Sequence, residues 1–586
     1  MRKIAIIGAG ESGAQLALGL QRDGYAVTLF SDRSAAQIRT GKVMSSQCMF
    51  STALDAEAQL GTALTGLYES GSVPDITSIR MRVEGPDETI NWEAPLDGAA
   101  RSIDQRIKSA LWIETFVAAG GDFRIEKVTA RMLEELARDY ELVIVSTGKG
   151  EIGQIFPRDK AKSPFDRPQR VLALNYVTPD AGAAASADGD TATGTGSDAI
   201  RMSMAPGVGE FFTIPGLTVS GPCRMMVFEG VVGGPMDRWT DVVTPEEQLQ
   251  RSLEILREHF PHEAENFADA QLTDSGATLL GRITPTVRSA VGELGNGKLV
   301  FGLGDAVVLN DPISGQGSNN ATLAAKYYLD AIVRRGQQPF DREWMDRTFD
   351  EFWRSWGQWA VAWTNDLLKP RRDHQKTLLS EAGEHPALAA SIVGGFDDPR
   401  TSYPWWFDAT AAADFMQARK EEDSAAFDLR DFRGALGQFA TGVTVVTTVA
   451  ADGRKVGMTA NSFTSVSMEP PLVLWCPSKR APSLGDFEDA THFAINILAS
   501  DQHVLSRQFA TPSTDKFAGA ETTEGIAGVP LLDGAVATFQ CRTVSRHDAG
   551  DHVIYVGEVE KYNNDGGAPL IFHSGKYHAT ATHPDF

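Results

Sequence analysis

The chain has 586 residues, of which 42% are hydrophobic, and carries a formal net charge of -23. This length is too great for one core and predicts about three or four domain-sized units. The strong negative charge argues against a nucleic-acid backbone or an anionic membrane surface as a partner.

The N-terminal residues and the cysteines predict where the protein is found. No apolar run is long enough to span a bilayer, and the opening MRK does not look like the start of a signal peptide. The four cysteines form no CxxC pair, so we expect neither a zinc site nor a disulfide framework. These are Cys48, Cys223, Cys476 and Cys541. We expect a reduced, cytoplasmic protein that holds no metal and contacts no membrane.

The first elements in chain order form a β-α-β pattern. Residues 2–8, RKIAIIG, are a short apolar run typical of a buried parallel strand. Residues 12–23 are helix-like and are closed by Gly24, and residues 25–30 form a second strand. The pattern predicts an α/β fold that opens with a Rossmann-like, doubly wound parallel sheet.

The turn after the first strand has the spacing of a dinucleotide-binding motif, GxGxxG. Its glycines are Gly8, Gly10 and Gly13. Such glycines let backbone N–H groups approach a pyrophosphate at the positive end of a helix. Glu11 and Asp32 are both candidates for the ribose contact, although neither has the usual spacing, and Arg33 is a candidate for a phosphate.

Further along, two predicted strands end in glycine, where ligands bind in open α/β sheets. They are residues 141–145 and 298–301.

Residues 180–198 are polar and of low complexity, so we expect a flexible surface loop without chemistry. Residues 343–368 are rich in aromatics at helical spacing, which favours a helix packed on the core over a ligand-stacking role. Residues 411–427 are charged and helix-prone and are expected to link the two halves.

The pattern changes after Leu429 from β-α-β units to short strands. Residues 443–449 are a β-branched run, and Asp452-Gly453 is a strong hairpin signal. Further strands are predicted at 471–476, 492–498, 535–544 and 552–561. Strands joined by short turns predict a small barrel.

A second cofactor motif lies late in the first half, at 302–306 (GLGDA) and 311–319 (DPISGQGSN). The pair resembles the C-terminal FAD fingerprint of flavoprotein hydroxylases. The resemblance implies that Gly304 and Asp305 approach the ribityl or pyrophosphate part of FAD. It also implies that a turn meets the flavin ring at a helix N-terminus, which would stabilise charge on the reduced ring. The turn residues are Gly315, Gln316 and Gly317. We therefore expect FAD, not NAD, in this half.

Residues 1–410 as a whole resemble the epoxidase component of two-component styrene monooxygenases. The similarity is carried by residues 25–33, 145–150, 162–170 and 303–317. The family uses reduced FAD delivered by a separate reductase, forms a C4a-(hydro)peroxyflavin with O2, and transfers one oxygen atom to an aryl-substituted double bond. The resemblance implies this chemistry for the first half.

The segment SSQCMF, residues 45–50, departs from the Asn-Thr pair of the styrene-specific enzymes and resembles the indole-oxidising subgroup. Indole would be epoxidised at C2–C3 and the product would give indoxyl and indigo; styrene, giving styrene oxide, stays open as the substrate. Position in the family makes Ser45, Gln47, Met49, Pro312 and Ile313 catalytic candidates, with Val43 and Met44 near the substrate. The alternative is that 45–50 is a core loop.

Residues 428–586 resemble the short-chain flavin reductases that serve such oxygenases. The matching segments are 431–446, 457–471, 493–498 and 550–559. The family fold is a split β-barrel homodimer that binds flavin between subunits and takes hydride from NADH. The resemblance therefore implies a homodimer formed through this half; NADH and NADPH are not separated by the sequence.

Three groups of residues are cofactor candidates in this half. Uncharged polar residues suit hydrogen bonds to a neutral flavin edge, namely Thr459, Asn461, Ser462, Thr464 and Ser465. Hydroxyls and cations suit phosphate, namely Ser478, Lys479, Arg480 and Ser483. The resemblance puts His552 beside the nicotinamide, whereas a histidine at the start of a strand is more often simply exposed.

The sequence therefore predicts a self-sufficient monooxygenase with an epoxidase at 1–410, a linker at 411–427 and an NADH:flavin oxidoreductase at 428–586. NADH reduces FAD in the second half, and the first half uses reduced FAD and O2. Two alternatives remain: a flavin oxidase or dehydrogenase with its own pyridine-nucleotide site, and a flavin-binding redox sensor.

Overall fold

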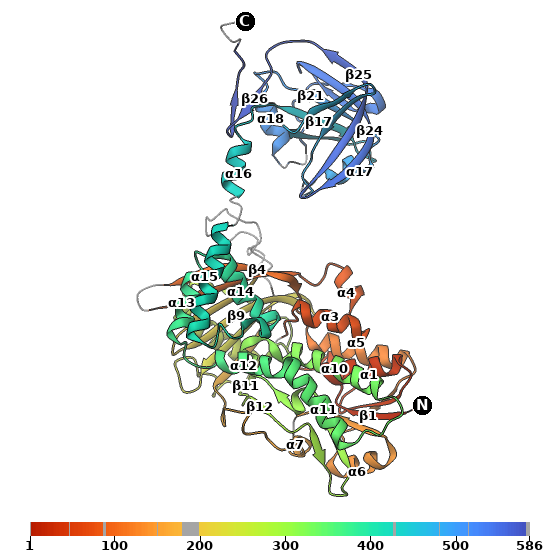
Figure 1. Cartoon of the computed structure of the whole chain (residues 1–586), viewed down its shortest axis with the longest axis vertical. Helices are drawn as coiled ribbons and strands as arrows, with labels where there is room; N and C mark the ends of the chain where they lie inside the picture. Colours follow the sequence, from red (N-terminus) through yellow and green to blue (C-terminus); the bar gives the residue numbers. More distant parts are fainter. Residues whose placement is uncertain are drawn as a thin grey trace. The chain divides into compact units, whose positions relative to one another are not determined.

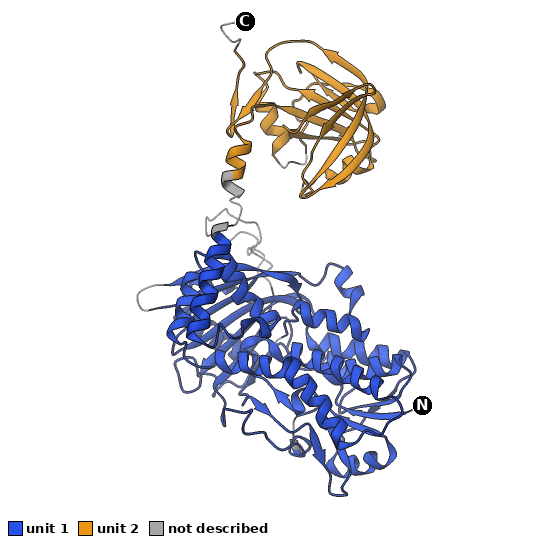
Figure 2. Cartoon of the chain, viewed as in Figure 1, with its two compact units in different colours: residues 1–425 blue, residues 426–586 orange. Residues whose placement is uncertain are grey.

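The computed structural model describes residues 2–45, 47–85, 89–148, 150–178, 199–425, 429–479, 481–511, 513 and 515–581. Within it the chain divides into two compact units, residues 1–425 and 426–586 (Figure 2). The predicted loop at 180–198 and the candidate Arg480 lie outside the described residues.

The first sheet of unit 1, which includes β1 (Figure 1), has six strands in the order β13-β14-β6-β1-β2-β5. Their bounds are β1 Lys3–Ile7, β2 Ala26–Ser31, β5 Asp122–Ile125, β6 Leu142–Val145, β13 Val291–Glu293 and β14 Leu299–Gly302. Strand β1 pairs in parallel with both β2 and β6, and helix α1, Glu11–Arg22, connects β1 to β2. The β-α-β opening is therefore present, and the edge strand β13 runs antiparallel to β14.

The second sheet of unit 1 has seven strands in the order β11-β7-β10-β9-β8-β3-β4. Their bounds are β3 Ile76–Val83, β4 Ile90–Ala100, β7 Arg170–Val177, β8 Ala199–Ala205, β9 Gly209–Thr218, β10 Gly221–Val231 and β11 Thr278–Gly281. Strands β7, β9 and β10 pair antiparallel, whereas β3 and β8 are parallel. One face packs on a core that contains Ile313 and Trp363, and the other on a core that contains Trp239 and Leu253 of α8.

Helices of unit 1 surround these sheets. Those that lie between α1 and the second fingerprint in the sequence are α2 Ala35–Arg39, α3 Ser51–Leu60, α4 Thr65–Glu69, α5 Gln105–Ala118, α6 Ala130–Asp139, α7 Gly150–Gly153, α8 Pro245–His259 and α9 Pro261–Ala264. The long helix α10, Gln316–Arg335, begins directly after the predicted flavin turn. Two short strands that precede α10 in the sequence, β12 Thr286–Val287 and β15 Val308–Leu309, pair antiparallel with each other.

The aromatic segment predicted as one helix at 343–368 is helical throughout. It consists of α11 Arg342–Phe352, a π-helical turn at Trp353–Gly357, and α12 Gln358–Leu367. The side chains of its buried aromatics belong to two of the apolar cores of unit 1, as predicted. They are Trp344, Phe349, Phe352, Trp356 and Trp363. The π turn inserts an extra residue into the helix and was not predicted.

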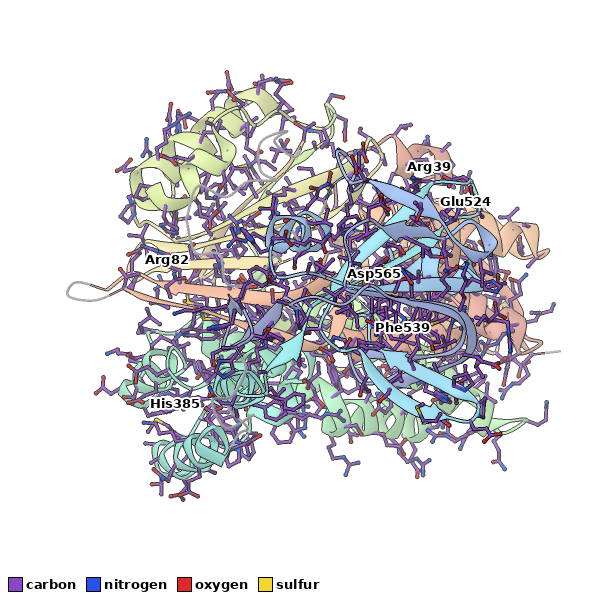
Figure 3. All side chains as sticks on the ribbon, turned by 90° about the horizontal axis from the view of Figure 1, so that it is seen from above. Arg39, Arg82, His385, Glu524, Phe539 and Asp565 are labelled. Atoms are coloured by element: carbon purple, nitrogen blue, oxygen red, sulfur yellow. The ribbon has the colours of Figure 1, made fainter. Side chains whose placement is uncertain are left out.

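Most of the segment expected as a linker forms helix α15, Ala409–Ala425, which docks on unit 1 beside α13, Asp373–Glu381, and α14, Pro386–Asp397. Asp423 accepts a 3.0 Å hydrogen bond from the Ala387 amide at the start of α14. His385, labelled in Figure 3, lies 3.6 Å from Asp423. The structure therefore assigns α15 to unit 1.

Unit 2 contains a seven-stranded antiparallel sheet in the order β18-β17-β21-β24-β25-β20-β19. Their bounds are β17 Thr444–Val449, β18 Lys455–Ala460, β19 Thr464–Met468, β20 Pro471–Trp475, β21 His492–Ile497, β24 Ala537–Ala549 and β25 His552–Asn564. The predicted strands are present, and Gly453 in the β17–β18 hairpin has a φ of +84°. Since β18 and β19 are the edges of this sheet, its closure into a split barrel stays a prediction.

Smaller elements complete unit 2. They are α16 Leu429–Leu436, α17 Leu484–Asp489, α18 His503–Ala510, a sheet of β16 Thr441–Gly442, β26 Ile571–His573 and β27 Lys576–His578, and a pair of β22 Thr522–Glu524 and β23 Pro530–Leu532. In the described part of the chain, no helix has the length and apolar character needed to cross a membrane.

Candidate active sites of the two units

Close packing requires two of the three glycines in the first turn, whereas the third has free space where a side chain would lie. Gly8 has a φ of +110°, and a Cβ on Gly13 would lie 2.0 Å from the Gly8 carbonyl oxygen. A Cβ on Gly10 would have Gln105 Nε2, at 3.7 Å, as its nearest neighbour. Gly8 and Gly13 therefore let α1 pack closely on β1, while Gly10 leaves the backbone open to a ligand.

A buried charge network lies directly behind this turn. Glu11, the first residue of α1, accepts a 2.8 Å hydrogen bond from Lys108 Nζ, which also lies 2.8 Å from Glu57. Burial raises the pKa of Glu11, and the two carboxylates raise the pKa of Lys108 although burial opposes its charge. Because Lys108 offsets the charge of Glu11, the α1 N-terminus can still accept an anionic group.

The second fingerprint forms a capped turn before α10. Asp311 Oδ1 accepts a 3.2 Å hydrogen bond from the Ile313 amide, and Gly315, at a φ of +67°, leads into the helix. A Cβ on Gly304 would lie 2.5 Å from Ser12 Oγ, so the fingerprint's first glycine packs on α1. At Gly317 a Cβ would have no neighbour within 4 Å.

Unpaired polar atoms around the start of α10 provide a test of whether a flavin fits. The side-chain oxygens of Gln47, Gln316 and Asn320 are buried and accept no hydrogen bond from the described residues. Gln316 Nε2 donates to the Phe396 carbonyl at 2.7 Å, which fixes the direction of its amide. Buried acceptors without partners are costly, so the oxygens of Gln316 and Asn320 fit the polar edge of an isoalloxazine ring, and the oxygen of Gln47 fits a donor on a second ligand.

Asn319, on the first turn of α10, ties the predicted substrate loop to the predicted flavin turn. Its Oδ1 accepts a 2.9 Å hydrogen bond from the Phe50 amide, and its Nδ2 donates to the carbonyls of Cys48 and Gly315, each at 2.8 Å. The apolar side chains of Phe50 and Ile313 share one core. Asn319 is the last residue of the quoted motif 311–319, but it was not among the predicted site residues.

The substrate-loop candidates lie in this region. Val43, Gln47 and Met49 are buried, and Met44 is partly buried. Ser45 Oγ donates to Gln105 Oε1 at 3.2 Å, and Gln47 Nε2 donates to Glu11 Oε2 at 3.0 Å. Through Gln47 the loop is joined to the charge network behind the first glycine turn.

The two candidates after β2 do not both face the glycine turn. Asp32 is exposed and lies 3.6 Å from Arg33 Nε. Arg33 Nη2 lies 3.2 Å from the Met44 sulfur, so the guanidinium points along the substrate loop. The structure thus associates Arg33 with the loop at 43–45 more closely than with the first fingerprint.

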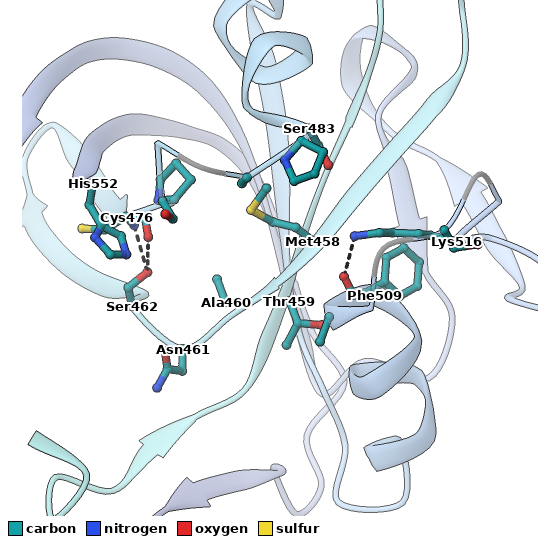
Figure 4. Close-up of a pocket in the computed structure, with 16 residues that line it drawn as sticks. Met458, Thr459, Ala460, Asn461, Ser462, Cys476, Ser483, Phe509, Lys516 and His552 are labelled. Atoms are coloured by element: carbon teal, nitrogen blue, oxygen red, sulfur yellow. Dashed lines mark hydrogen bonds between the residues drawn. The ribbon is translucent and has the colours of Figure 1, made fainter. Parts of the chain in front are cut away.

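Unit 2 contains a pocket of about 670 Å³ that collects many of its predicted cofactor residues (Figure 4). Those that line it are Thr459, Asn461, Ser462, Ser478, Ser483 and His552. Thr464 and Ser465 lie instead on β19, exposed and away from this lining, and Lys479 pairs with Asp548 at 3.1 Å. Cys476 and Lys516 also line the pocket.

Hydrogen bonds show what some of these side chains do. Ser462 Oγ accepts from the Cys476 amide at 2.9 Å, and Thr459 Oγ1 donates to the Ser506 carbonyl at 2.6 Å, so both hydroxyls hold the pocket wall. Lys516 Nζ donates to the Phe509 carbonyl at 2.8 Å, and burial lowers the pKa of Lys516. His552 Nδ1 lies 2.8 Å from Asp551 Oδ1, which orients the ring.

Three of the four thiols are inert by burial. Burial raises the pKa of Cys48, Cys223 and Cys541 to about 12 in each case. Cys476, in the pocket wall, is the partly exposed one. Within the ranges that the structure describes, no three His, Cys, Asp or Glu side chains come together as a metal site.

Comparison with known proteins assigns each unit. Residues 436–581 match the model described as "Flavin reductase like domain", and residues 148–266 match "Styrene monooxygenase A putative substrate binding domain". The chain is 49% identical over 148 residues to the FMN reductase (NADH) SmoA of Agrobacterium fabrum, which covers 25% of this chain and 84% of that protein. It is 27% and 29% identical over 381 residues to styrene monooxygenases StyA of Pseudomonas fluorescens and a Pseudomonas species, covering 63% of this chain and 85% of each.

The chain belongs to the flavin reductase-like family and joins its reductase unit to a styrene monooxygenase-like unit. The resemblances of the first half to styrene monooxygenase and of the second half to the flavin reductases are thereby confirmed. The relative of the reductase unit is named for a flavin and for NADH, the two kinds of cofactor expected from the sequence. The pocket around His552 lies in the reductase unit, and the region around Asn319 lies in the monooxygenase-like unit.

Proposed function

We propose that this chain is a self-sufficient monooxygenase in which the reductase unit reduces FAD with NADH and the first unit uses the reduced FAD. The observation that carries the proposal is that one chain contains both matched regions, 148–266 and 436–581. Joining the two raises the local supply of reduced flavin and limits its wasteful reaction with O2.

When bound, the flavin accepts hydride in the reductase unit and activates O2 in the first unit. The protein supplies binding and shape. In the reductase unit, Asn461 and Ser478 face the flavin, and His552, oriented by Asp551, lies by the nicotinamide. Ser483 and Lys479 serve the phosphates.

In the first unit, the N-termini of α1 and α10 face the anionic parts of FAD, with Gly10 and Gly317 giving access to the backbone. The apolar wall formed by Val43, Phe50 and Ile313 excludes water from the oxygen-transfer step. An aromatic substrate with a reactive double bond suits such a wall.

One buried acceptor favours indole over styrene as that substrate. The Gln47 amide donates to the Glu11 carboxylate, which leaves Gln47 Oε1 buried without a donor from the described residues. Indole has an N–H group that can donate to this oxygen, whereas styrene has none. We propose that indole is epoxidised at C2–C3 and goes on to indoxyl and indigo.

The test is to incubate the full-length protein with NADH, FAD and either indole or styrene. We expect NADH oxidation, product containing one oxygen atom from O2, and blue pigment with indole. In Gln47→Leu we expect indole turnover to fall about tenfold more than styrene turnover, because only indole loses a hydrogen bond. Equal losses would contradict the assignment of Gln47, and no product from either substrate would contradict the function.

A second arm tests the division of labour between the units. His552→Ala should lose NADH-driven oxygenation and retain oxygenation when FAD is reduced chemically. Oxygenation driven by NADH in this variant would instead support a pyridine-nucleotide site in the first unit, the oxidase or dehydrogenase alternative. Stable flavin with negligible NADH turnover in the unmodified protein would support a redox sensor.

We also propose that the reductase unit forms a homodimer. Large apolar side chains of this unit are exposed in the single chain, among them Phe439 at 78% and Met468 at 89%. Surfaces of this kind mark protein contacts. Light scattering of Met468→Lys should show a shift from dimer to monomer, and an unmodified protein that is monomeric would contradict the proposal.

A further inference from the structure

A buried carboxyl group in the large sheet of unit 1 has no role so far. Glu229, on β10, is 0% exposed, and neither of its oxygens accepts a hydrogen bond from an N–H or hydroxyl donor of the described residues. Its neighbours on the same face of β10, Val227 and Met225, belong to the core that includes Phe50 and Ile313. Because side chains alternate along a strand, Glu229 is on the face of the sheet turned toward the candidate site.

Burial raises the pKa of Glu229, and the neighbouring carboxyl of Asp311, which is itself only 1% exposed, raises it further. Two neighbouring carboxylates that are both buried and lack a donor to Glu229 are costly when both are charged, which favours a proton on one of them. Asp311 also caps the turn Pro312–Ser314 through the Ile313 amide. The protonated pair is therefore built into the turn predicted to face the flavin ring.

The charges around the pair favour one shared proton. Glu210 on β9 lies directly opposite Glu229 in the strand register, and Arg170 on β7 holds Glu210 with two hydrogen bonds of 2.7 and 2.9 Å. Burial lowers the pKa of Arg371, which follows α12, and the charges of Glu210 and Asp366 oppose this shift. Three carboxyls and two guanidiniums are neutral together when one carboxyl is protonated, and burial, the main cause, raises the pKa of both Glu229 and Asp311.

The chemistry of the proposed function, on which this inference rests, consumes a proton. Anionic reduced flavin, O2, substrate and one proton give oxidised flavin, the epoxide and water. One oxygen atom enters the substrate, the other leaves as water, and the flavin supplies the two electrons. A site that excludes bulk water needs an internal source for this proton.

We propose that Glu229 and Asp311 are an acid pair that stores this proton and supplies it to the oxygen-transfer reaction beside the turn 312–315. The proton leaves the shared carboxyl pair and ends in the water formed. The pair, then doubly ionised, takes a new proton from solvent before the next cycle. In Glu229→Gln the new amide can donate an N–H to Asp311, but it holds no transferable proton.

The first test needs no flavin. Infrared spectra of the full-length protein at neutral pH should show the carbonyl stretch of one protonated carboxyl, shifted in D2O and absent from Glu229→Gln. Glu263→Gln is the matched control, because Glu263 is also buried but pairs with Arg201 at 3.3 Å, so the band should remain. Absence of the band from the unmodified protein would overturn the proposal.

The second test measures product formation after mixing with chemically reduced FAD, between about pH 6 and about pH 9. In the unmodified protein the rate of product formation should depend little on pH. In Glu229→Gln this rate should fall about tenfold for each unit of rising pH, because the proton then comes from solvent. A variant with the same pH profile as the unmodified protein would overturn the proposal. An unmodified protein that shows the infrared band but oxygenates neither substrate would contradict the proposed function and not the acid pair.

Discussion

The amide N–H of Phe50 donates a 2.9 Å hydrogen bond to the side chain of Asn319, and this bond fixes the end of the substrate loop to the start of α10. The two residues are far apart in sequence, and both bonds that Asn319 donates also end on backbone carbonyls. One side chain thereby sets the spacing between the predicted substrate loop and the predicted flavin turn.

We expect Asn319→Ala to lower the free energy of unfolding of unit 1 by about 1–3 kcal/mol, because it leaves buried backbone groups unpaired. Oxygenation with chemically reduced FAD should fall, while NADH oxidation by the reductase unit should remain. Asn296→Ala, on the exposed β13–β14 turn, is the control, with an expected change within about 0.5 kcal/mol. Equal unfolding midpoints in urea for the two variants would contradict the role of Asn319.

Gly317 offers a test of the flavin turn that separates binding from folding. A Cβ there has no neighbour within 4 Å, so Gly317→Ala should fold normally and gain up to about 1 kcal/mol as a helix residue. Binding of FAD to unit 1 should nonetheless weaken at least about tenfold, because the methyl occupies the approach to the backbone. Gly394→Ala in α14, equally open, should gain similar stability and keep flavin binding. Equal affinities in a fluorescence titration would remove Gly317 from the site.

Lys108 should be indispensable for folding. Lys108→Met leaves the carboxylates of Glu11 and Glu57 buried without their cation, and we expect a loss of about 3–5 kcal/mol. Lys376→Met, which removes an exposed 3.0 Å pair with Asp373, should cost under about 0.5 kcal/mol. Urea unfolding followed by tryptophan fluorescence compares the two, and a small loss for Lys108→Met would show that the network is not a buried ion pair.

The acid pair also gives stability a defined pH dependence. Since burial raises the pKa of Glu229 in the folded protein, the folded state binds more protons than the unfolded state between the ordinary carboxyl pKa and the raised one. Its contribution to stability is complete below the ordinary pKa and is lost as pH rises through this window, by up to about 1.4 kcal/mol per pH unit. Glu229→Gln should reduce the change of the unfolding free energy with pH. Unfolding free energies that rise with pH by the same amount in both proteins would contradict the sign.

Cys476 should be the first thiol to react in the native protein. It lies in the wall of the reductase pocket, whereas Cys48, Cys223 and Cys541 are buried. Mass spectrometry after brief alkylation should find label on Cys476 alone, and FAD should slow the labelling. The other three should react only in denaturant; early labelling of any of them would contradict its burial.

Local sequence patterns predicted the elements whose signals are local. The glycine turn at 8–13, the aromatic helices and the β-branched strands of unit 2 all depend on spacing within a short window. The seven-stranded sheet of unit 1 was not predicted, because β7 and β9 are buried along their whole length and show no alternation.

The parts of the site that depend on distant pairing were missed for the same reason. No local rule relates Lys108 to Glu11 or Glu229 to Asp311, since only the folded chain brings them together. Ser462 was assigned to the flavin from its residue type, yet its hydroxyl is used by the Cys476 backbone. Family position suggested where cofactors bind, but the supporting contacts come from the structure.

The high pKa of the three buried thiols has a consequence for durability. Reduced flavin that escapes reacts with O2 to give hydrogen peroxide, and peroxide attacks the thiolate form of cysteine. A thiol with a pKa of about 12 is almost never a thiolate at neutral pH, so Cys48, Cys223 and Cys541 are protected from this by-product. Burial raises the pKa of Cys476 too, but this thiol is partly exposed in the pocket wall. Oxidative ageing is therefore expected to begin at Cys476, and the NADH-consuming half should fail before the oxygenating half.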